Sequence, residues 1–241
     1  MRKNKKRIAV YSIVIGLIVA NVLLWQNLKN PHQISADGGG LNYNYGLASY
    51  VSSLPSRSEK NTLVAKTTDL GFGWVREEYT YQDSISFVPY DAAYSKINAA
   101  GLKILGLLTY PEGRSHDAWK SYVSKVVSRY PGVGAWEIMN EADNYLSAAD
   151  YTTYLKEASA IIRSKTSAPI VLSGLKARWE VYPFWDGVAA AGGWGDFDKV
   201  GLHIYHDGNP YEDSYNNGIF SSEIQQVVVV LIEMAAGNPF G

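Results

Sequence analysis

Residues 133–144 read Val-Gly-Ala-Trp-Glu-Ile-Met-Asn-Glu-Ala-Asp-Asn, and this stretch decides the fold. The run 133–139 is short and mostly apolar, and Pro131-Gly132 precedes it, as is typical of a buried strand. Asn140 and Glu141 follow directly, so a carboxylate lies where the strand leaves the core. In a parallel α/β barrel that end of each strand carries the catalytic groups. Glu141 is therefore a candidate acid or base beside Asn140; the alternative is a glutamate that caps the next helix.

Similar strand-like runs recur along the chain at a spacing of about thirty residues. They are predicted at residues 45–51, 73–78, 102–108, 133–139, 169–175 and 199–205. Helices are predicted between them at residues 58–70, 91–100, 116–130 and 147–167. This alternation predicts an α/β fold with a parallel sheet wrapped by helices, and its regularity favours a (β/α)8 TIM barrel over an open doubly wound sheet. No Gly-x-Gly-x-x-Gly turn follows the first strand to support a nucleotide-binding fold.

The C-terminal segment leaves two interpretations open. Residues 224–235 carry apolar side chains at helical spacing, and Gly237 is placed to end a helix. Residues 227–232 are also rich in β-branched side chains and fit a seventh strand that ends at Glu233. We favour the helix, because the segment before it is a poor crossover helix. The barrel is then incomplete, with about six βα units, and we expect these residues alone to be inactive.

The N-terminal segment predicts membrane targeting. Residues 1–7 form a basic flank, and residues 8–25 are uncharged and long enough to approach the thickness of a bilayer. We expect a transmembrane anchor, with a cleaved signal peptide as the alternative. Residues 26–42 read as a linker and residues 43–241 as the partial barrel. The basic flank would remain in the cytoplasm, which predicts a single-pass membrane protein with its barrel outside the cell, or a secreted protein in the alternative.

Composition narrows the classes of partner. The net charge of −1 gives no indication of nucleic acid. Cysteine is absent, which excludes disulfides, thiolate metal sites and a cysteine nucleophile. The 18 tyrosines and seven tryptophans suit a surface that stacks on sugar rings, although core packing accounts for most of them. His203, His206 and Asp207 do not predict a metal site, because residues three apart on a strand face opposite ways, and no cofactor is expected.

Four segments together resemble glycoside hydrolases of clan A, with the nearest likeness to xylosidase-like and cellulase-like members. The segments are Trp136-Glu-Ile-Met-Asn-Glu141, Gly71-Phe-Gly-Trp-Val-Arg76, Gly101-Leu-Lys-Ile-Leu105 and Val200-Gly-Leu-His-Ile-Tyr205. They resemble strands four, two, three and six of that family of (β/α)8 enzymes. The likeness fails at strand seven, where the family's Thr-Glu followed by an aromatic residue and Gly is absent. Ile232-Glu-Met-Ala235 is at best a degenerate copy.

The resemblance implies a retaining glycosidase that cleaves a polysaccharide or oligosaccharide without a cofactor. Glu141 would be the acid/base, and Glu233 the nucleophile only if residues 227–232 form strand seven. Substrate contacts are implied for Asn140, Arg76, His203, Tyr205 and Tyr110.

Arg76 has two candidate roles. It would orient the nucleophile, or it would form a structural ion pair with Glu77, Glu78 or Glu137. Glu137 is expected to lie deeper than Glu141 and to pair with a cation.

Two rival functions remain. The first is a carbohydrate-binding barrel at the cell surface whose catalytic pair is incomplete. The second is a metal-dependent barrel hydrolase, which metal analysis of the purified protein would detect.

Overall fold

The computed structural model describes residues 40–176 and 181–203 of the 241-residue chain. Within these ranges, six strands form one sheet in the order β1-β2-β3-β4-β5-β6, and each strand pairs in parallel with its sequence neighbours. The strands are β1 (Asn42–Ala48), β2 (Phe72–Tyr79), β3 (Lys103–Leu108), β4 (Ala135–Asn140), β5 (Ile170–Lys176) and β6 (Lys199–His203). The α/β class and the parallel sheet are confirmed, and the six strands make a half-barrel, consistent with an incomplete TIM barrel.

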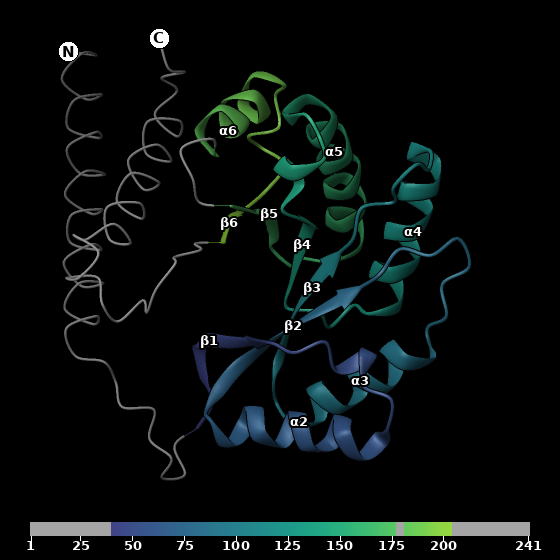
Figure 1. The fold of residues 1–241 in the computed structure, drawn as a ribbon, viewed down its shortest axis with the longest axis vertical. Coiled ribbons are helices and arrows are strands. Elements are labelled where there is room, and N and C mark those ends of the chain that lie inside the picture. The colour runs from purple at the N-terminus through teal and green to yellow at the C-terminus, as the bar shows by residue number, and fades with distance from the viewer. Residues whose placement is uncertain (1–39, 177–180, 204–241) are drawn as a thin grey trace, which may run out of the picture.

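Helices follow the strands and cover the outer face of the sheet (Figure 1). They are α2 (Arg57–Asp69), α3 (Val88–Ala99), α4 (His116–Arg129), α5 (Ala148–Lys165) and α6 (Val181–Ala190), with 3-10 turns η1 (Val51–Ser53) and η2 (Ala142–Asn144). Neighbouring helices contact one another in chain order, as α2 with α3, α4 with α5 and α5 with α6. The four helices predicted from sequence are confirmed with shifted ends.

Helix α6 is an element that the sequence analysis missed. Its sequence contains Pro183 and Gly187, which are poor helix formers, together with three aromatic residues. Trp185 and Val188 are fully buried within it. Burial of these side chains therefore outweighs the weak local propensity.

Local sequence signals place the helix ends. Ser56 and Glu59 form a capping box at the start of α2, since the Ser56 side chain accepts from the Glu59 amide and the Glu59 carboxylate from the Ser56 amide. Ser115 and Ser147 cap α4 and α5 through their side chains. Gly71 follows α2 with a φ of 75°, a left-handed conformation that glycine adopts readily.

The core between sheet and helices is rich in aromatic rings. Tyr79 of β2 packs against Tyr90, Tyr130 and Trp136, with ring centroids 5.2, 5.0 and 5.6 Å away. Tyr79, Tyr130 and Trp136 are at most 1% exposed. Much of the tyrosine and tryptophan content thus serves packing, as the composition suggested.

No helix within residues 40–176 and 181–203 is long and apolar enough to cross a membrane. The predicted anchor at residues 8–25 and most of the predicted linker lie outside these ranges. The C-terminal segment, including residues 224–235, also lies outside them.

Candidate active site

Glu141, the predicted acid/base, and three predicted substrate contacts lie toward the carboxyl ends of the strands. Arg76 lies in the second half of β2, three residues before its end, Asn140 is the last residue of β4, and His203 is the last residue of β6. Glu141 follows β4 directly and is the N-cap residue of η2. Because the six described strands are parallel, these ends share one edge of the sheet, where catalytic groups gather in barrels.

The backbone around Glu141 is strained. Met139 has a φ of 65° and Glu141 a φ of 48°, a left-handed region that costs a non-glycine residue about 1–3 kcal/mol. Met139 is fully buried, so the core around it holds this conformation. The regular alternation of strand faces is interrupted here, and Glu137 and Asn140, three residues apart, both reach Arg76. Sequence periodicity alone does not predict this convergence.

The Glu141 carboxyl group is held by two neighbours. Its Oε1 lies 3.0 Å from His203 Nδ1, and its Oε2 accepts a hydrogen bond of 3.0 Å from Asn144 Nδ2. The side chains of Glu141 and His203 are 12% and 23% exposed. One proton lies between Nδ1 and Oε1, either on a histidine that donates to the carboxylate or on a carboxylic acid that donates to the histidine. A carboxyl group with such a proton partner can act as an acid or a base.

Arg76 binds two side chains of β4 at once. Its Nε and Nη2 donate to the two Glu137 carboxylate oxygens at 2.6 and 3.0 Å, and Nη2 also donates to Asn140 Oδ1 at 2.8 Å. Burial alone would lower the pKa of Arg76, but the hydrogen bond and the charge of Glu137 outweigh it and raise that pKa. Arg76 Nη1 also lies 3.4 Å from the Tyr50 hydroxyl.

This geometry decides between the ion-pair partners proposed for Arg76. Glu137, with a side chain 3% exposed, is the partner, so the prediction that Glu137 pairs with a cation is confirmed. Glu78 accepts instead from the Thr80 hydroxyl. A role of Arg76 in orienting a nucleophile remains a prediction.

Glu77 points away from this site, toward the helices. Its oxygens accept hydrogen bonds from the Val51 amide at 2.7 Å and from the Ser52 amide at 3.0 Å, and the Ser52 hydroxyl also donates to it. Burial raises the pKa of Glu77. Lys60 donates to the carbonyls of the same two residues. Glu77 thus ties η1, which follows the first strand, to β2.

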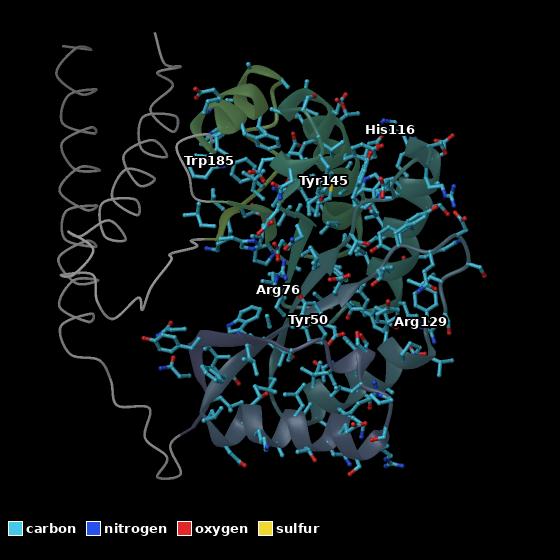
Figure 2. The ribbon with its side chains drawn as sticks, viewed as in Figure 1. Tyr50, Arg76, His116, Arg129, Tyr145 and Trp185 are labelled. Atoms are coloured by element: carbon cyan, nitrogen blue, oxygen red, sulfur yellow. The ribbon has the colours of Figure 1, made fainter. Side chains whose placement is uncertain are left out.

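Two tyrosines border the site on the side of β3 and α5. Tyr110, which the resemblance implied as a substrate contact, stacks on Tyr145 at 5.1 Å. The sequence analysis did not single out Tyr145, although it lies four residues after Glu141. Figure 2 labels Tyr145 above Arg76 and Tyr50 below it. Proximity to the Asn-Glu pair was the signal that could have identified Tyr145.

The inner face of the half-barrel is hollow below Arg76. A cavity of about 470 Å³ is bordered by residues from all six described strands. It is lined by Tyr43, Asn44, Tyr45, Gly46, Leu47, Ala48, Trp74, Arg76, Leu105, Ala135, Pro169, Val171 and Lys199. The lining is mostly apolar, and Arg76 borders both this cavity and the polar cluster above it.

The remaining predicted site residues, Tyr205 and Glu233, lie outside the described ranges. Among the residues that the structure describes, no three histidine, aspartate or glutamate side chains are grouped so that they could hold a metal ion.

The sequence matches no protein-family model and no curated protein. A β-galactosidase from the psychrophilic Marinomonas ef1 is similar in structure, with a TM-score of 0.50 at 12% identity, over 66% of this chain and 40% of that enzyme. A GH128 (subgroup II) endo-β-1,3-glucanase from Sorangium cellulosum gives 0.48 at 16% identity, over 76% and 69%. A family 1 β-glucosidase from Thermotoga maritima gives 0.41 at 11% identity, over 65% and 49%.

These structural neighbours are glycoside hydrolases, and the likeness to the β-galactosidase shows that the half-barrel shares the fold of the matched part of that enzyme. The chain spans 40% of the length of the β-galactosidase and 49% of that of the β-glucosidase.

Proposed function

We propose that this protein hydrolyses O-glycosidic bonds in a polysaccharide or oligosaccharide, in the manner of a clan A enzyme, with Glu141 as the acid/base. The observation that carries the proposal is the position of the Glu141 carboxyl group. It lies at the carboxyl end of β4, is mostly shielded from solvent, and has its Oε1 within hydrogen-bond distance, 3.0 Å, of His203 Nδ1. The cluster of Arg76, Glu137 and Asn140 lies beside it and supplies polar groups for sugar hydroxyls.

The proposed reaction is a double displacement that retains the configuration of the sugar. A second carboxylate attacks the anomeric carbon while Glu141 gives its proton to the departing oxygen, which breaks the glycosidic bond. Glu141 is then a carboxylate and removes a proton from water, which attacks the anomeric carbon and releases the enzyme's nucleophile. His203 and Asn144 hold the Glu141 carboxyl group in place through both steps. Glu233 is the candidate nucleophile within this sequence.

The test compares Glu141→Gln with wild type in the complete product of the open reading frame. Cleavage of a trisaccharide needs a proton on the leaving oxygen, so kcat/KM of Glu141→Gln for trisaccharides should fall by about 10²–10⁴. The dinitrophenyl glycosides of the same sugars need no such proton, so their first-step burst of dinitrophenol should persist. Glu112→Gln, at an exposed position beyond β3, is the control and should leave both rates unchanged. Equal loss on both substrates would contradict the acid role, and no hydrolysis by wild type would contradict the proposed function.

The alternative is a carbohydrate-binding barrel whose catalytic pair is incomplete. One observation favours it: Arg76, the residue expected to orient a nucleophile, is already bound to both oxygens of Glu137. Trisaccharide binding that is retained in Glu141→Gln, without hydrolysis by wild type, would support this alternative.

The location of the protein is a separate proposal that rests on residues 1–25. We expect the barrel to face the outside of the cell, tethered by residues 8–25, or to be secreted if that segment is cleaved. Protease treatment of intact cells should then degrade the barrel of the tethered form, and protection of the barrel in intact cells would contradict export.

A further inference from the structure

Tyr145 presents an exposed ring that is nevertheless fixed in place. The side chain is 44% exposed. Its hydroxyl donates a hydrogen bond of 2.9 Å to the Asn140 carbonyl oxygen. One face of the ring stacks on Tyr110, with centroids 5.1 Å apart and an angle of 26° between the planes. A ring that is already ordered loses little conformational entropy when a ligand binds to it.

The ring is backed by a row of side chains that passes through the buried Tyr154 to the half-exposed His116. Tyr110 lies edge-on to Tyr154 at 5.6 Å and 88°. Tyr154 is 7% exposed and stacks on His116 at 4.3 Å. His116 in turn lies 2.9 Å from the Glu157 carboxylate. These contacts support the Tyr145 ring on the side of α4 and α5.

The position of Tyr145 relative to Glu141 indicates that its ring lies on the side of the site that holds the leaving group. The two residues flank the same short turn, η2. The Tyr145 hydroxyl is bound to the carbonyl of Asn140, the residue just before Glu141. A general acid gives its proton to the oxygen of the leaving group, so the sugar that carries this oxygen lies beside the acid.

We propose that Tyr145, backed by Tyr110, stacks against a pyranose ring of the leaving group. This inference rests on the proposed function, because it takes Glu141 as the acid. The face of a tyrosine ring is electron-rich, and a pyranose with equatorial substituents presents axial C–H groups to it. The matching substrates are oligosaccharides or polysaccharides of β-linked gluco- or xylo-configured units, in preference to glycosides with a small leaving group.

The first test measures sugar binding. Cellotriose, laminaritriose and xylotriose are titrated by calorimetry into the complete product of the open reading frame that carries Glu141→Gln, so that no sugar is consumed. At least one trisaccharide should bind. The additional change Tyr145→Ala should weaken it about tenfold, whereas Tyr145→Phe, which keeps the ring, should stay within about twofold. Failure of all three sugars to bind, or unchanged binding by Tyr145→Ala, overturns the proposal.

Tyr94 offers a matched control. Its hydroxyl accepts a hydrogen bond of 2.9 Å from the Gly132 amide, and its ring lies 5.0 Å from that of Tyr130. It belongs to α3, on the outer face of the sheet and away from Glu141. Tyr94→Ala should bind the trisaccharides as well as its parent. Equal loss in Tyr94→Ala and Tyr145→Ala would show general damage and overturn the proposal.

The second test determines whether Tyr145 contacts the sugar of the leaving group. With Glu141 intact, Tyr145→Ala should lower kcat/KM about tenfold for the trisaccharide but leave the glycosyl fluoride of the same sugar within about twofold, because fluoride reaches no stacking ring. Equal loss on both substrates overturns the leaving-group assignment. Hydrolysis that does not depend on Tyr145 would contradict the proposed stacking on Tyr145 but would leave the proposed function intact. If sugar binding depends on Tyr145 but wild type hydrolyses no sugar, the proposed function is contradicted, and so is the assignment of Tyr145 to the leaving group.

Discussion

Arg76 shows how one side chain can organise a site made from separate strands. It joins β2 to β4 through Glu137 and Asn140, which are 61 and 64 positions away in sequence. Both members of the Arg76–Glu137 pair are largely buried, with side chains 15% and 3% exposed. A buried charge that loses its partner is strongly destabilising, because the remaining charge stays out of water.

We therefore expect Arg76→Met to lower the free energy of unfolding by about 3–5 kcal/mol, measured by urea denaturation followed by circular dichroism. Arg163→Met is the matched control. Arg163 pairs with Asp198 at 3.2 Å, but the two side chains are 46% and 38% exposed, so its loss should cost at most about 1 kcal/mol. Similar losses in the two variants would show that the Arg76 pair does not depend on burial.

At the level of elements, the packing of β3 against β4 depends on a glycine. A Cβ atom at Gly106 would lie 2.7 Å from Trp136 Cζ3 and 3.2 Å from Tyr79 Cε2. Trp136 is fully buried and Tyr79 nearly so, so neither ring has room to move. The close approach of backbone and ring allows the aromatic core to fill the space between these strands and the helices.

Gly106→Ala should therefore destabilise the protein by about 1–3 kcal/mol through overpacking, read from the midpoint of urea unfolding. At Gly195, an added Cβ meets no atom within 4 Å, so Gly195→Ala should change stability by about 0.5 kcal/mol or less. A neutral Gly106→Ala would mean that Trp136 can shift, contrary to its tight packing.

Across the whole molecule, the protection of backbone amides against hydrogen exchange is expected to decrease from the central strands of the sheet to its edge strands. Strands β3 and β4 pair on both edges, and β4 is buried along most of its length. Within the described residues, β1 and β6 pair along one edge only, and much of β1 is exposed. Open edges are where strands unfold locally and where they invite pairing with other chains.

Hydrogen exchange followed by mass spectrometry should therefore show the slowest amide exchange in β3 and β4 and faster exchange in β1 and β6. Exchange of β6 as slow as that of β3 would contradict this expectation and would indicate that another segment covers the β6 edge.

The sequence by itself determined the order of the six strands and of helices α2 to α5, and the edge of the sheet that carries Asn140 and Glu141. Strand and helix periodicities are local, and parallel βα units must place successive strand ends together, so no distant contact is needed for that prediction. Glycine and serine signals placed the helix ends for the same reason.

Tertiary structure alone decided which side chains meet. The contact between Glu141 and His203 spans 62 positions, and the choice of Glu137 as the partner of Arg76 spans 61. The left-handed backbone at Met139 and the stacking of Tyr145 on Tyr110 are also set by the packed core. The physical reason is that the curl of the sheet and the packing around it fix these distances, and neither is encoded in the periodicity of any single segment.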